Sequence, residues 1–103
     1  MLNIIVTMRV KEGRMKEFLA VCEALRPQVL REEGCLGYEY LRETASPLGI
    51  QEPVEADRIT LVERWKTVEA LKAHLASPHM KEAGLKMKDL RSSVTARAFE
   101  PLF

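Results

Sequence analysis

The sequence predicts an α+β fold, in which a four-stranded antiparallel sheet is covered on one face by helices. Four segments alternate between apolar and polar residues or are rich in β-branched residues, as strands are, and other segments repeat their apolar residues at steps of three and four, as helices do. Along the chain these segments follow the order strand, helix, strand, strand, helix, strand. The 103 residues are enough for a single domain, residues 1–103.

The first half of this pattern is a strand over residues 3–10 followed by a helix over residues 14–33. Pro27 lacks a backbone N–H and is expected to kink this helix, and Gly34 stands where a left-handed C-terminal cap is wanted. The strand places Ile4, Val6, Met8 and Val10 on one face, and the apolar stripe of the helix contains Met15, Phe18, Leu19, Cys22, Leu25 and Val29.

Two further strands are expected at residues 35–43 and 58–66, separated by a long loop at residues 44–57 that carries two prolines and a glycine. Loops of this length are often functional in compact domains. The first of these strands would place Leu36, Tyr38 and Tyr40 on one face, and the second would place Ile59, Leu61, Glu63 and Trp65 together.

The last region begins with a helix over residues 68–76, for which Thr67 is a good N-cap. Ser77 can cap a second helical piece from Pro78 to about Leu90, with the proline at its permitted first position. Val68, Leu71 and Leu75 are expected to form the core stripe of the first piece, and residues 92–99 form the last strand, with Val94, Ala96 and Ala98 on one face.

This order is the split βαβ arrangement of the ferredoxin-like fold. Both faces of the predicted sheet carry apolar side chains, but the helices can cover only one of them. A second copy of the chain, packed sheet to sheet, would cover the other face and make a homodimer. The candidates for that second face are Ile5, Thr7, Leu41 and Phe99.

Composition excludes several classes of protein. Sixteen Lys and Arg against fifteen Asp and Glu give a net charge of +1, which argues against a nucleic-acid partner or an acidic membrane surface. The longest apolar run is far too short to cross a bilayer, and the absence of a signal pattern predicts a cytoplasmic protein. The two cysteines, Cys22 and Cys35, lie in no CxxC or Cys/His cluster, so neither a disulfide framework nor a metal site is expected.

The two histidines are the first candidates for chemistry. His74 is expected at the edge of the core stripe of its helix, where an imidazole could line a pocket or could simply bond a backbone carbonyl. His79 follows Pro78 in the first turn of the next helical piece, where the positive end of the helix favours a neutral imidazole. A neutral imidazole can exchange a proton near pH 7, but the position favours a local capping or surface role over catalysis.

Glu63 and Trp65 share a face of the third strand with apolar residues. A buried carboxylate is costly unless it is paired, so Glu63 should meet an Arg, a His or a hydroxyl, or should act as a proton acceptor with a raised pKa. A structural ion pair with Arg42 or Arg97 is the plain alternative. Trp65 is either the largest core residue or a flat wall for an aromatic ligand.

Tyr38 and Tyr40 point the same way and could hold a ligand through a hydrogen bond and ring contacts, or could pack against the first helix. No nucleotide-binding glycine pattern, no HExxH and no GxSxG motif is present.

Residues 59–83, ITLVERWKTVEALKAHLASPHMKEA, resemble the signature of the antibiotic biosynthesis monooxygenase family. That signature is a strand ending in Glu-x-Trp, a helix with a His nine residues after the Trp, and then Ser/Thr-Pro-His. Residues 29–40, VLREEGCLGYEY, resemble the small quinol monooxygenase branch, as does the long loop after them. The matching positions are Glu63, Trp65, His74, Ser77, Pro78 and His79.

The resemblance implies a homodimeric α+β barrel with a pocket between the sheet and helices of each subunit. It implies oxygenation of quinols or polycyclic phenols by O₂ with no flavin, haem or metal, so that no cofactor is expected. His74 would be the base or the partner of a phenolate, Glu63 would orient His74 or a water, and Trp65 and Tyr38 would contact the ring. Tyr40 and His79 would sit at the rim of the pocket.

Other activities occur among proteins that resemble this chain. Relatives that degrade haem carry a ligating His near the place of Gly84 and an Asn that Val6 does not match. Another relative isomerises a small phosphorylated ketone, so acid–base isomerisation without O₂ stays open. A third alternative is a dimeric protein that binds a small ligand without turning it over.

Overall fold

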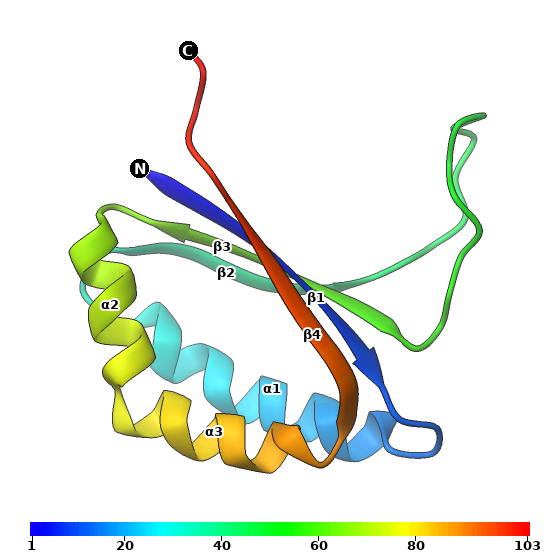
Figure 1. The fold of residues 1–103 in the computed structure, drawn as a ribbon, viewed down its shortest axis with the longest axis horizontal. Helices are drawn as coiled ribbons and strands as arrows, with labels where there is room; N and C mark the ends of the chain where they lie inside the picture. Colours follow the sequence, from blue (N-terminus) through cyan, green and yellow to red (C-terminus); the bar gives the residue numbers. More distant parts are fainter.

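The computed structural model describes residues 1–103 and confirms the predicted fold class (Figure 1). Its order differs from the simplest ferredoxin-like pattern in one respect, which is that two helices, rather than one, lie between the third and fourth strands. The elements are β1 (Leu2–Val10), α1 (Met15–Leu30), β2 (Cys35–Arg42), β3 (Arg58–Trp65), α2 (Val68–Ala76), α3 (Pro78–Lys88) and β4 (Arg91–Phe99).

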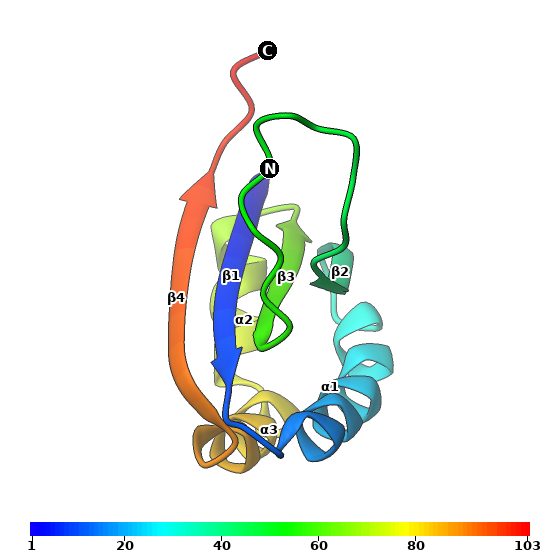
Figure 2. The same cartoon turned by 90° about the vertical axis from the view of Figure 1, so that its right-hand side faces the viewer.

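The four strands form one sheet in the order β2-β3-β1-β4, and every neighbouring pair is antiparallel. The helices lie together on one side of this sheet (Figures 1 and 2). The register places Ile4 of β1 beside Glu63 of β3, and Glu63 beside Tyr38 of β2. Side chains from three strands therefore meet on the face that the helices cover.

The core lies between that face and the helices. Because strand side chains alternate, Ile59, Leu61, Glu63 and Trp65 all point inward and are buried, as predicted. From α1 the buried residues are Phe18, Cys22, Leu25 and Val29. Leu19, which the predicted stripe also included, is 39% exposed and lies at its margin.

The first helix ends earlier than predicted. It runs through Pro27 and stops at Leu30, and residues 31–34 form a turn. Gly34 does adopt the left-handed conformation, with φ of 80°, but it does so in this turn rather than at the helix end. The turn packs tightly on α2, since a Cβ on Gly34 would lie 2.6 Å from the Cβ of Ala70.

Two expectations about which side chains face inward are wrong. Leu36 does not share a face with Tyr38 and Tyr40, because a bulge shifts the register between Cys35 and Gly37 and leaves Leu36 51% exposed. In α2, Val68 and Leu75 are about half exposed, and the residue at the centre of the buried face is His74.

The sheet face away from the helices is bare, and its half-exposed residues include the four predicted ones, Ile5, Thr7, Leu41 and Phe99. The segment between β2 and β3 stands clear of the body, as does the C-terminal end (Figure 1). β4 also places Val94 in line with Met8 on the helix side, yet Val94 is 46% exposed at the sheet edge. No helix has the length and apolar character needed to span a membrane.

Candidate functional site

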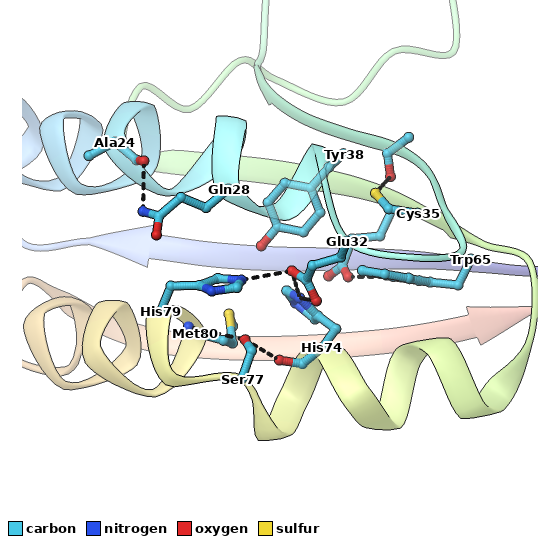
Figure 3. Close-up of polar contacts among 12 residues, drawn as sticks. Ala24, Gln28, Glu32, Cys35, Tyr38, Trp65, His74, Ser77, His79 and Met80 are labelled. Atoms are coloured by element: carbon cyan, nitrogen blue, oxygen red, sulfur yellow. Dashed lines mark hydrogen bonds and ion pairs between the residues drawn. The ribbon is translucent and has the colours of Figure 1, made fainter.

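Three separate elements bring the central candidate residues together at one end of the core (Figure 3). β3 supplies Glu63 and Trp65, β2 supplies Tyr38, and the short helix α2 supplies His74. Thr67 and Ser77 accept backbone hydrogen bonds at the starts of α2 and α3, as predicted, and so fix where the two helices begin.

His74 is the centre of this site. Its side chain is 1% exposed, and its Nδ1 lies 2.9 Å from Oε2 and 3.2 Å from Oε1 of Glu32. Its ring lies against Trp65, with centroids 4.7 Å apart, and against Tyr38, at 5.7 Å. The other ring nitrogen, Nε2, is buried and has no hydrogen-bond partner. A buried, unpaired nitrogen of this kind is unusual and calls for an explanation.

Glu63 is buried on the same face, but its partner was not predicted. Its Oε1 accepts a hydrogen bond of 2.9 Å from the indole Nε1 of Trp65, and neither Arg42 nor Arg97 reaches it. Burial raises the pKa of the Glu63 carboxyl, as expected, and the hydrogen bond from Trp65 offsets part of that rise. The carboxyl thus fixes the orientation of the indole ring that lies against His74.

The two tyrosines form a pair that leads outward from the site. Their rings meet edge to face with centroids 5.5 Å apart, and the Tyr40 hydroxyl donates to the Tyr38 hydroxyl at 3.4 Å. Burial raises the pKa of both phenols. Tyr40 also lines an apolar hollow of about 280 Å³. The other residues of that hollow are Met15, Leu19, Leu41, Arg42, Ala56 and Ile59.

His79 joins the site from the first turn of α3, where its Nε2 lies 2.9 Å from Oε2 of Glu32. Its side chain is 24% exposed, so solvent reaches the site on this side of Glu32. Glu32 is the residue that sequence reasoning missed. The sequence predicts it inside the helix over residues 14–33, and nothing in the sequence separates it from Glu33 beside it, which is exposed.

The side chains are not arranged as a metal site or a reactive-thiol site. No group of three or more His, Cys, Asp or Glu residues is placed to hold a metal ion. Burial raises the pKa of the Cys22 thiol to about 11, which keeps it protonated at neutral pH. The chemistry that this arrangement offers is proton transfer by an imidazole in surroundings rich in aromatic rings.

Comparison with known proteins places this geometry in a family. The family model for antibiotic biosynthesis monooxygenases matches residues 1–84. The Escherichia coli K12 protein named "Probable quinol monooxygenase YgiN" is 31% identical over 103 residues, which cover 98% of each chain.

Solved structures share the fold. A Caulobacter crescentus protein matches with a TM-score of 0.85 at 22% identity, covering 99% of this chain and 90% of its own. A Nitrosomonas europaea protein matches with a TM-score of 0.84 at 21% identity and full coverage of both chains. The family match covers most of the chain, including the strand, helix and Pro-His segment that carry the site. The chain belongs to the antibiotic biosynthesis monooxygenase family.

Proposed function

We propose that this protein is a monooxygenase that oxidises a quinol or a related aromatic phenol with O₂ and needs no bound cofactor. The observation that carries the proposal is the Nε2 of His74, which is buried, unpaired and flanked by the rings of Trp65 and Tyr38. Membership of the family and the likeness to a relative that bears the name of quinol monooxygenase support the same reaction class.

A quinol and O₂ suffice for the chemistry. Nε2 of His74 takes a phenolic proton, and the resulting anion gives one electron to O₂. The two radicals combine to a ring peroxide, which takes up the phenolic proton. The ring carbon then loses its own proton as the O–O bond breaks, and the departing oxygen leaves with both hydrogens as water. One oxygen atom enters the ring in place of hydrogen, and the quinol becomes a hydroxyquinone, so atoms and electrons balance without another reductant. A dry, aromatic site favours this path because it keeps water from the anion and the peroxide.

The route by which a ring reaches His74 follows the tyrosine pair. The site itself is closed, since His74 and Trp65 are 1% and 0% exposed. The apolar hollow beside Tyr40 has about 280 Å³, near the lower end of small-molecule pockets. The substrate ring enters there, and movement of the Tyr40 and Tyr38 side chains brings it to Nε2. In this scheme the two tyrosines bind the substrate and His79 closes the opposite side of the site.

The surroundings of His74 support this reaction over the isomerase alternative. Its contacts are with the carboxylate of Glu32 and with aromatic rings. A second carboxylate, Glu63, lies behind Trp65. Negative charge at this position disfavours a phosphorylated substrate and favours a neutral aromatic one, whose proton the imidazole can accept.

Oxygen uptake by the metal-free protein tests the proposal. We would supply a panel of reduced naphthoquinols and anthrols, subtract autoxidation, and compare the wild type with His74→Gln and Trp65→Phe. The general base is worth about 10²- to 10⁴-fold in rate, so His74→Gln should lose most of the saturable uptake. Trp65→Phe should weaken turnover less, because the phenyl ring keeps an aromatic surface beside His74 but loses the hydrogen bond to Glu63.

The matched control is Lys72→Ala, which changes an exposed residue on the same helix. It should keep full activity. Full activity in both His74→Gln and Trp65→Phe would show that the site is misplaced. Absence of uptake above autoxidation in the wild type would refute the oxygenase proposal, and an anaerobic ligand screen by thermal shift would then separate an isomerase from a binding protein.

A further inference from the structure

Glu32 lies in the turn between α1 and β2 and contacts both histidines of the chain. Its carboxylate lies 2.9 Å from Nδ1 of His74 and 2.9 Å from Nε2 of His79, and its side chain is 14% exposed (Figure 3). The turn after α1 and the two consecutive helices α2 and α3, more than forty residues further along the chain, thus meet at one carboxylate. An ionised carboxylate can only accept hydrogen bonds.

The chemistry of this contact decides which nitrogen of His74 is free. If Nδ1 donates its hydrogen to Glu32, then Nε2 of the neutral imidazole carries no hydrogen and holds a lone pair. The structure leaves Nε2 buried without any partner, as expected of a nitrogen reserved for a ligand. The opposite tautomer would place an N–H there with nothing to accept it, and would set the lone pair of Nδ1 against a carboxylate.

We propose that Glu32 is a positioning residue that holds His74 in the Nδ1–H tautomer, so that Nε2 is the base. The proposal rests on the assignment of His74 as the base in the proposed function. It does not require Glu32 to touch the substrate. When Nε2 gains a proton, the same carboxylate stabilises the imidazolium, as the third member of a catalytic triad does.

The fold holds Glu32 in place from both sides. The backbone N–H of Glu32 donates to the carbonyl of Val29 at 2.9 Å, and its carbonyl accepts from Cys35 at 3.2 Å. The carbonyl of Gly34 accepts from Lys66 at 2.8 Å, which ties the turn to the end of β3. Close packing of Gly34 on Ala70 ties the same turn to α2, the helix that carries His74.

The charged and titratable groups around His74 come from every neighbouring element. Glu32 from the turn contacts it directly, His79 from α3 shares that carboxylate, and Tyr38 from β2 contacts the ring. Glu63 from β3 is near enough for His74 to lower the pKa of its carboxyl, against the larger rise from burial. Glu32 is the one acidic group among them that bonds the imidazole, so removing it should release the tautomer.

Nuclear magnetic resonance of ¹⁵N-labelled histidine tests this directly. The chain has two histidines, so the His79→Gln variant assigns both sets of signals. At a pH where His74 is neutral, we expect the Nδ1–H form to dominate in the wild type and to persist in Glu33→Ala, the matched control. In Glu32→Ala we expect the signals to move toward the Nε2–H form that histidine favours in water.

Kinetics supply a second measure. Glu32→Ala should lower kcat by at least about tenfold, and by up to about 10⁴-fold, with KM nearly unchanged, as loss of the orienting acid does in a triad. Glu32→Gln keeps an acceptor oxygen but loses the charge, so it should retain the Nδ1–H form while its kcat falls and its pH profile moves. If Glu32→Ala unfolds, Glu32→Gln alone tests the proposal, because it should keep the tautomer while its kcat falls.

An Nε2–H tautomer in the wild type, or an unchanged tautomer in folded Glu32→Ala, would overturn the proposal. A wild-type rate in both Glu32 variants would do the same. Failure of the proposed function looks different, because the spectra then change as expected while no variant, including the wild type, consumes O₂ with a quinol.

Discussion

At the scale of single residues, the two buried polar side chains of the core differ in their hydrogen-bond partners. His74 shares a carboxylate with a second imidazole, whereas Glu63 receives one hydrogen bond from an indole N–H. One neutral donor satisfies only part of what an ionised carboxylate needs. The protein therefore holds a carboxyl whose charged form is costly, close to the imidazole that we propose as the base.

This cost predicts a pH dependence of stability. Because burial raises the pKa of Glu63 above its ordinary value of 4.5, the folded state keeps a proton that the unfolded chain releases. The free energy of unfolding should thus fall as the pH rises from 4.5 through the raised pKa. Glu63→Gln cannot titrate, so it should not show this fall. The free energy of unfolding of Glu63→Gln, compared with that of the wild type, should therefore be higher at pH 7 than at pH 4.

Urea unfolding at a series of pH values measures this difference, with the exposed Glu69→Gln as the control. The control should follow the wild-type curve. Parallel curves for wild type and Glu63→Gln would show that Glu63 titrates normally and that the partly satisfied carboxyl carries no cost.

At the scale of elements, the turn after α1 matters more than the helix itself. It carries Glu32, and its backbone is left-handed at Gly34, where α2 packs against it. Gly13 has nearly the same φ, 77°, but nothing lies within 4 Å of the Cβ it would gain. A substitution at Gly13 therefore measures backbone strain alone, whereas one at Gly34 measures backbone strain together with close packing.

Gly13→Ala should cost about 1–2 kcal/mol of stability, the strain of the left-handed conformation. Gly34→Ala should cost that amount and about 1–3 kcal/mol more, because the new methyl group meets Ala70. Chemical denaturation measures both values. Ala70→Gly should recover part of the loss in Gly34→Ala but none in Gly13→Ala. Equal costs at the two glycines would mean that the turn and α2 are not tightly packed.

Gly34→Ala should also disturb the site, because it moves the turn that carries Glu32 away from the helix that carries His74. The same histidine spectra report this movement.

The bulge in β2 lies at the start of that strand, where it turns Leu36 outward and keeps Tyr38 aligned with Glu63.

At the scale of the whole molecule, the sheet has one covered face and one bare face. Ile5 lies on the bare face of the central strand β1, between Val62 and Arg97 of its neighbours. The exposed Leu48 and Ile50 project on the long loop, and Leu102 and Phe103 on the C-terminal end. Apolar side chains that cannot reach the chain's own core favour a second copy as the cover, which is the homodimer we predict.

Ile5→Glu should weaken that dimer, because it places a charge at the centre of the face that we expect to pair. Phe99→Asp should do so less strongly, at the edge strand. Sedimentation velocity over a range of concentrations measures the association, and Leu85→Glu, on the far surface of α3, is the control. A wild-type monomer, or a dimer indifferent to both changes, would show that this face does not pair.

Much of this protein follows from local pattern. Alternation in β1 and β3 identifies the strands and the inward face that holds Glu63 and Trp65. Thr67, Ser77 and Pro78 mark the helix starts, because capping depends on a few neighbouring residues. The family followed from the same short segment.

The contacts that make the site were decided only by the tertiary structure. Helical periodicity put Val68 and Leu75 on the core side of α2, but the turn at Gly34 and the carboxylate of Glu32 rotate the buried face to His74. Glu63 met an indole rather than an arginine because register places it beside Tyr38 and Ile4, away from charged side chains. The contact between Glu32 and His74 joins residues 42 positions apart, so no local pattern encodes it, and packing in three dimensions selects it.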